Sequence, residues 1–121
     1  MLTSLLLAPP PGLRSSLAAE NGDAAQGRKL ATTHCSRCHM IPDHNTMGGI
    51  DSTPSFRALT WVPDYPTRVR TFFQRHPHPV FVRVAGYPRW SDSPASVPEF
   101  EITSEQIEDI LAFVRGFESE E

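Results

Sequence analysis

The sequence predicts a small all-α domain, built of three to four short helices that are joined by long loops. Twelve prolines in 121 residues, with an apolar content of 39 %, favour short helices over long ones. The clearest hydrophobic periodicity is helical, and a single run, residues 80–84, has the composition of a strand. The predicted core is therefore small for an unaided domain of this length.

Residues 1–21 are expected to precede the folded domain, which then spans residues 22–121. The opening LTSLLLAPPPGL is apolar but too short to span a bilayer, and small residues near Ala18 and Ala19 follow it, as in a signal peptide. Because no positive residue precedes the apolar run, the true signal peptide is expected to begin upstream; a disordered proline-rich leader is the alternative. An export segment predicts a periplasmic or otherwise extracytoplasmic protein without stable membrane insertion after export.

The first helix is predicted to begin near Asp23, a favourable N-cap residue, and to run through DAAQGRKLATTH up to a cysteine. The following segment, MIPDHNTMGGIDSTPSFRALT, carries two prolines and two adjacent glycines, so it is predicted to be a loop. Within it, residues 55–60 favour one short helix.

A further helix is predicted to begin with Pro66 at its first position and to carry Val69, Phe72 and Phe73 on one side. The HPHP run at residues 76–79 should end it, because proline donates no hydrogen bond and restricts the residue before it. VFVRV is expected to form a short extended segment or ribbon, and YPRWSDSPASVPEF an irregular loop.

The last helix has the strongest signal. Thr103 as N-cap and Gln106 three residues later form a capping box, and apolar residues then repeat at intervals of three and four. The pattern predicts an amphipathic helix of about 13 to 15 residues, with an apolar face made of Ile107, Ile110, Leu111, Val114 and Phe117.

The segment CSRCH holds the only two cysteines, Cys35 and Cys38, followed directly by His39. This spacing suits a redox dithiol, half of a zinc site, or haem attachment through two thioether bonds. A zinc site lacks a second ligand pair at suitable spacing, and a redox dithiol would follow a strand rather than a helix. In C-x-x-C-H both cysteines bond to the haem vinyl groups and the histidine binds the iron. The motif therefore predicts one covalently attached haem c, with His39 as the proximal iron ligand.

With this motif and its flanking helices, the chain resembles the class I c-type cytochromes of the small bacterial, single-haem kind over about residues 22–117. Gly27 and Leu30 resemble that family's first helix, in which the glycine permits a close crossing of the last helix. Phe113 lies where the family usually has an aromatic residue against that glycine. TPSFRAL, residues 53–59, resembles the proline-containing loop on the proximal side. The resemblance implies a cytochrome c-like fold around one haem.

A bound porphyrin would also enlarge the small core, because it offers a large apolar face. Without haem the chain is predicted to fold poorly. The residues expected to be buried against the haem are Leu30, Phe56, Leu59, Phe72, Ile110 and Val114.

The sixth iron ligand is where the sequence departs from this family. Relatives supply a distal methionine from a segment such as MPEF just before the last helix, whereas this chain has VPEF at residues 97–100. Met40 lies directly beside the proximal histidine and is badly placed to reach the opposite face. His78, in QRHPHPVF, is the favoured substitute, because flanking prolines hold it stiffly.

Other sixth ligands remain open: His76, Met47, a water molecule or no ligand at all. His34 and His44 are expected to be plain surface residues.

The axial ligands decide between two functions. Two strong ligands favour a low-spin iron and fast electron transfer, whereas an open position admits a diatomic gas. The favoured function is a one-electron carrier between redox partners, and haem-based gas binding or sensing is the alternative. No acid–base pair can be assigned on the distal face, so the chain is not expected to be an enzyme.

The charges predict transient protein partners and exclude a general nucleic-acid binder. The net charge is −3 with a pI near 5.9, and nucleic-acid binding needs a positive surface. Residues 57–89 carry six arginines against Asp64 alone, while residues 99–121 carry eight acids against Arg115. This asymmetry predicts a dipolar protein that docks briefly on redox partners, as a monomer or as a subunit of a redox complex.

Overall fold

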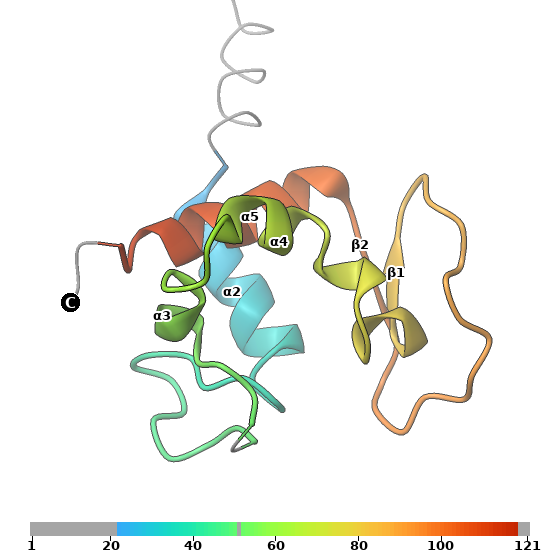
Figure 1. The fold of residues 1–121 in the computed structure, drawn as a ribbon, viewed down its shortest axis with the longest axis horizontal. Helices are drawn as coiled ribbons and strands as arrows, with labels where there is room; N and C mark the ends of the chain where they lie inside the picture. The colour runs from blue at the N-terminus through green and yellow to red at the C-terminus, as the bar shows by residue number, and fades with distance from the viewer. Residues whose placement is uncertain (1–21, 51, 119–121) are drawn as a thin grey trace, which may run out of the picture.

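The computed structural model describes residues 22–50 and 52–118, whose fold is shown in Figure 1. These residues form the helices α2 (Ala24–His34), α3 (Phe56–Leu59), α4 (Tyr65–Arg70) and α5 (Ser104–Arg115), with long loops between them. Two short strands, β1 (Val82–Val84) and β2 (Phe100–Ile102), pair beside the helices. The predicted helical architecture with long loops is confirmed. The leader predicted at residues 1–21 lies outside the described residues.

Helices α2 and α5 cross in close contact, and Gly27 makes this possible. A Cβ atom on Gly27 would lie 2.9 Å from the backbone nitrogen of Ile110 and closer still to the carbonyl of Asp109. The Asp109 side chain also accepts a hydrogen bond of 2.8 Å from the backbone N–H of Asp23, the N-cap of α2. The two helix backbones therefore touch where any larger residue would hold them apart.

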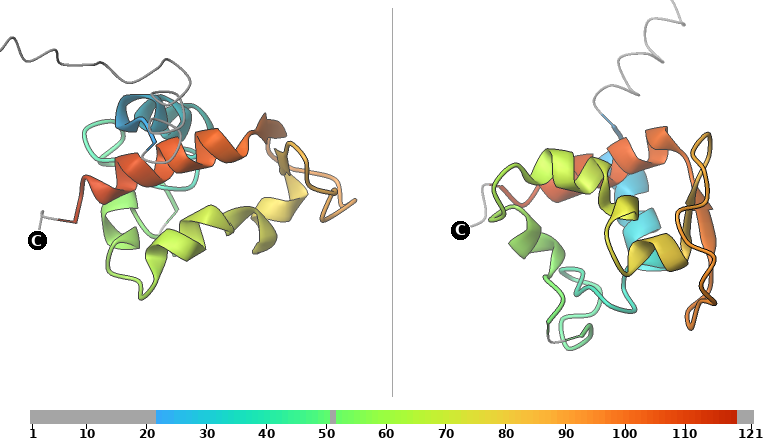
Figure 2. Two further views of the ribbon diagram at one scale, coloured as in Figure 1. Left: turned by 90° about the horizontal axis from the view of Figure 1, so that it is seen from above. Right: turned by 45° about the vertical axis from the view of Figure 1, so that its right-hand side comes forward.

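Helix α5 forms the centre of the packed core. It lies between α2 on one side and α4 on the other (Figure 2). The predicted capping box is present: the Thr103 hydroxyl accepts from the Gln106 N–H at 3.1 Å, and the Gln106 side chain accepts from the Thr103 N–H at 2.9 Å. The apolar face is buried as predicted at Ile107, Ile110, Leu111 and Val114, and Phe117 is partly buried.

Replacing Thr103 with alanine should lower the free energy of unfolding by about 1 kcal/mol, because the first turn of α5 loses an N-cap acceptor. Thr103→Ser keeps the hydroxyl and should remain close to the parent protein. Guanidinium denaturation of the haem-bound protein, followed by far-UV circular dichroism, measures both. Equal losses in the two variants would show that the cap contributes little to stability.

The helix at α4 is shorter than predicted. Its α-helical part ends at Arg70 instead of reaching the HPHP run. The Thr71 hydroxyl donates a hydrogen bond of 2.8 Å to the carbonyl of Thr67, and the Thr71 backbone leaves the helical conformation with φ −119°. A threonine that bonds back to the preceding turn weakens a helix at that point. Two 3-10 turns follow, η1 (Phe72–Gln74) and η2 (His78–Val80).

The strand-like run at residues 80–84 does form an extended element, but its partner was not predicted. Strand β1 pairs in parallel with β2, with Val82 opposite Phe100 and Val84 opposite Ile102. The segment containing β2 was expected to be loop up to Phe100. Val82, Val84 and Ile102 are buried, so this small ribbon closes the core beside η2. A three-residue strand carries too little periodicity to be recognised without its partner.

Candidate functional site

The cysteine motif continues the end of α2 as a helical turn. The Cys35 N–H donates to the carbonyl of Ala31 at 2.8 Å, and the His39 N–H donates to the carbonyl of Cys35 at 2.9 Å. This i to i+4 bond winds the motif so that Cys35, Cys38 and His39 share one side of the turn. The predicted attachment and ligand residues are therefore grouped on a single face.

The environment of Cys35 does not favour a reactive dithiol. Burial, with a smaller contribution from Cys38, raises the pKa of the Cys35 thiol to about 12. A redox nucleophile needs a thiolate, which this environment disfavours. A neutral thioether sulfur has no such requirement. The environment of Cys35 thus favours haem attachment over a redox dithiol.

His39 is oriented by the loop that follows the motif. Its Nδ1 lies 2.7 Å from the carbonyl oxygen of Pro54, in the segment that resembles the proximal proline loop. Because a carbonyl only accepts, Nδ1 carries the proton and Nε2 keeps a free lone pair. Burial lowers the pKa of His39, with the Pro54 bond acting in the opposite direction, and this favours the neutral imidazole that binds a metal.

Asn45 holds this loop against the motif, a role that no pattern in the sequence predicted. Its side-chain amide donates to the carbonyl of Ser36 at 2.9 Å and to that of His39 at 3.3 Å. Its carbonyl oxygen accepts from the N–H of Ile41 at 2.6 Å. One side chain thus satisfies three backbone groups around the proximal histidine. Such a bridge depends on how the chain folds back, so no local pattern identifies it.

His78 lies at the start of η2 and is surrounded by aromatic rings. Its ring lies 5.0 Å from that of Phe72 and 5.9 Å from that of Phe81, measured between centroids. Its Nδ1 lies 3.0 Å from the carbonyl oxygen of Arg75, which again assigns the proton to Nδ1 and the lone pair to Nε2. Burial is the main cause that lowers the pKa of His78, so this imidazole is also neutral near pH 7.

The rings of His39 and His78 lie nearly parallel, at a separation close to that of two ligands of one iron. Their centroids are 6.3 Å apart and their planes differ by 12°. A metal–nitrogen bond of about 2 Å and an imidazole radius of about 1.1 Å place two opposed imidazoles about 6.2 Å apart across one metal ion. The separation of the two rings is therefore close to that of two histidines bound to one iron.

Apolar side chains around these histidines fit the porphyrin as well. Phe56 is buried and lies edge-on to the ring of His39, with 5.5 Å between centroids. Of the six residues predicted to contact haem, Phe56, Ile110 and Val114 are buried, whereas Leu30, Leu59 and Phe72 are only partly buried and pack against the core. Partly covered apolar surface of this kind suits a flat apolar cofactor.

A cavity of about 560 Å³ adjoins the second cysteine. His34 and Cys38, at and just after the end of α2, line one side of it. Val97 and Phe100, in the segment before α5, line the other side together with Phe81. Val97, where relatives have the distal methionine, thus lies on a wall of this cavity.

The other candidate ligands are placed less favourably. His76 and His44 are exposed, and the Met47 side chain is 99 % exposed. His34 was expected on the surface; its ring is partly exposed and stacks on Phe100. Among the candidate ligands in the described residues, His78 is the one whose ring lies nearly parallel to that of His39, with 6.3 Å between the centroids.

The predicted separation of charge is offset in part by ion pairs in the folded chain. Arg70 donates to both carboxylate oxygens of Glu108 at 2.7 and 3.2 Å. Arg83 and Arg89 both pair with Glu99, at 3.1 and 3.0 Å. Three of the six arginines in residues 57–89 therefore meet acids of the C-terminal segment. Charges that are separated along the sequence come together because α5 and β2 pack against α4 and β1.

A helical domain with a C-x-x-C-H turn is typical of a c-type haem protein. A family model described as Cytochrome c matches residues 24–118, and the chain belongs to this family. Members carry electrons on a haem c that is attached through the cysteine pair, so haem c is the cofactor and haem-based electron transfer is the general activity.

The comparisons with curated proteins and with solved structures give no match. In the part of the chain that the structure describes, none of the helices has the length and apolar character needed to cross a bilayer.

Proposed function

We propose that this cytochrome is a one-electron carrier whose iron is bound by His39 and His78, with haem c attached to Cys35 and Cys38. The observation that carries the proposal is the spacing of 6.3 Å between two nearly parallel imidazole rings. Two nitrogen ligands leave no position for a gas or peroxide, and they change little between the ferric and ferrous states. This set of ligands suits electron transfer better than catalysis or gas sensing.

The hydrogen bonds behind the two rings support the same proposal. Each Nδ1 faces a backbone carbonyl, that of Pro54 for His39 and that of Arg75 for His78. Such outer contacts fix the tautomer and orientation of a ligating imidazole and make it a stronger ligand. Replacing the usual thioether by an imidazole should lower the reduction potential relative to histidine–methionine relatives.

The cellular setting belongs to the proposal as well. We place the folded domain, residues 22–121, outside the cytoplasm, in keeping with the expected export segment at residues 1–21. Its partners are redox proteins that it meets transiently. Because several arginines are already paired with acids, docking should rely less on a large charge dipole than the sequence implied.

The spectra of the haem-bound protein test this function directly. The oxidised form should be low-spin, and the reduced form should react with carbon monoxide slowly and only as fast as a ligand leaves the iron. Nearly parallel imidazole planes also predict a rhombic low-spin signal in electron paramagnetic resonance. A high-spin ferric form that binds carbon monoxide at once would refute electron carriage through two histidines and support the gas-binding alternative.

A further inference from the structure

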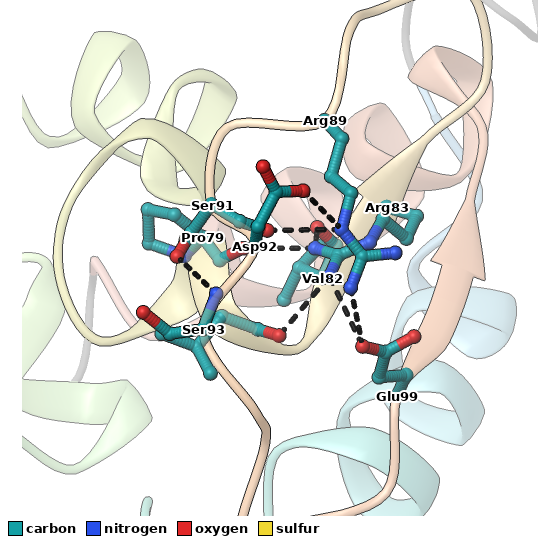
Figure 3. Close-up of polar contacts among 9 residues, drawn as sticks. Pro79, Val82, Arg83, Arg89, Ser91, Asp92, Ser93 and Glu99 are labelled. Atoms are coloured by element: carbon teal, nitrogen blue, oxygen red, sulfur yellow. Dashed lines mark hydrogen bonds and ion pairs between the residues drawn. The ribbon is translucent and has the colours of Figure 1, made fainter.

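We infer that Arg83 and Glu99 are positioning residues, which clamp the turn bearing His78 against β2 and so keep this histidine on the iron. This inference rests on the proposed ligation by His78. The clamp consists of the Arg83 guanidinium, the carbonyls of η2 and the Glu99 carboxylate, and is shown in Figure 3.

The Arg83 side chain ties together most of the η2 turn. Its Nη1 donates to the carbonyls of Pro79 at 2.8 Å and Val82 at 3.0 Å, and its Nη2 donates to that of Val80 at 3.2 Å. Pro79 and Val80 directly follow His78. The side chain of Arg83 is only 19 % exposed, so water competes weakly for these bonds.

Glu99 anchors the guanidinium to the neighbouring segment. Its Oε1 accepts from Nη2 of Arg83 at 3.1 Å and from Nη2 of Arg89 at 3.0 Å. Arg89 is held in turn by the carbonyl of Ser91 at 2.9 Å and by Asp92 at 3.4 Å. Figure 3 shows both guanidinium groups converging on this one carboxylate. The long loop between β1 and β2 is thereby closed onto the η2 turn.

The position of Glu99 gives the clamp its significance. It belongs to VPEF, residues 97–100, the segment that supplies the distal methionine in the cytochromes that this chain resembles. Here the same segment carries no ligand, but it holds the turn on which the alternative ligand lies. The register of Val82 opposite Phe100 sets Arg83 near Glu99, so the parallel ribbon and the clamp form one unit.

Loss of the clamp should let His78 leave the iron more often. Hydrogen bonds to charged groups are strong enough that removing them should raise the rate of ligand release by about ten- to a hundredfold. The backbone of η2 would still hold His78 near the iron, so most molecules should remain low-spin.

The test measures carbon monoxide binding to the reduced haem protein in Arg83→Ala, Glu99→Gln and the parent. At high carbon monoxide concentration the observed rate reaches a limit set by the release of the distal ligand. That limit should rise about tenfold or more in Arg83→Ala and less in Glu99→Gln, which keeps the carbonyl contacts of Arg83. Hydrogen exchange at the amides of Val80 and Phe81 should accelerate in parallel.

Arg70→Ala is the matched control, because it removes an arginine that bonds a carboxylate of α5, that of Glu108. Its limiting rate should equal that of the parent, even if its unfolding midpoint falls. Equal limiting rates in Arg83→Ala and Arg70→Ala would overturn the clamp. If His78→Ala itself shows the parent's rates, the proposed ligation fails instead, so the two failures are distinguishable.

Discussion

His78→Ala is expected to convert the low-spin cytochrome into a high-spin form that binds carbon monoxide without a rate limit. The ring of His78 is the one placed opposite His39, at 6.3 Å and with nearly parallel planes. Alanine cannot bind iron, and the exposed Met47 and His76 are poorly placed to replace the ring. The sixth position should therefore open almost completely. Optical spectra of both oxidation states, with and without carbon monoxide, measure the change.

His76→Ala is the control for this variant. This variant also removes a histidine side chain, but at an exposed position two residues earlier in the same proline-containing run. Its spectra should match those of the parent protein. A low-spin, unreactive His78→Ala would contradict the ligation by His78. Conversion in His76→Ala instead would assign the iron bond to that histidine.

Gly27→Ala should destabilise the protein by about 3 kcal/mol or more, because the crossing of α2 and α5 leaves no room for a Cβ atom. The added carbon would fall on the backbone carbonyl of Asp109 and 2.9 Å from the nitrogen of Ile110. Backbone atoms cannot rotate away as a side chain can, so the helices must separate. Guanidinium denaturation of the haem-bound protein measures the loss.

Gly116→Ala provides the comparison for the same chemical change. Gly116 has a φ of −60°, and its added Cβ would meet only the Phe113 carbonyl, at 3.2 Å. Its stability should stay within about 1 kcal/mol of the parent. If both glycine variants lost equal stability, the effect would come from helix composition and not from the crossing.

Local signals in the sequence predicted the helical elements well. Asp23 and Thr103 begin α2 and α5 as predicted, because an N-cap interacts with its own next turn. The predicted α4 was too long. The Thr71 hydroxyl donates a hydrogen bond to the carbonyl of Thr67 and so competes with the backbone hydrogen bonds of the helix, an effect that hydrophobic periodicity does not reveal. Strand β2 was missed because its pairing depends on residues 18 positions earlier in the chain.

The sequence by itself determined the family, the haem attachment motif and the absence of a methionine from VPEF, the segment directly before α5. These features are consecutive residues whose spacing has a chemical meaning of its own. It also narrowed the distal ligand to a few candidates, among which His78 stayed a prediction.

Only the tertiary structure could compare those candidates. It brings the η2 turn near the cysteine motif, pairs Glu99 with Arg83, and offsets part of the charge separation suggested by the sequence. All three depend on the parallel pairing of β1 with β2 and on the packing of α5. Such contacts join residues far apart in the chain, and they are decided by the burial of apolar surface over the whole domain.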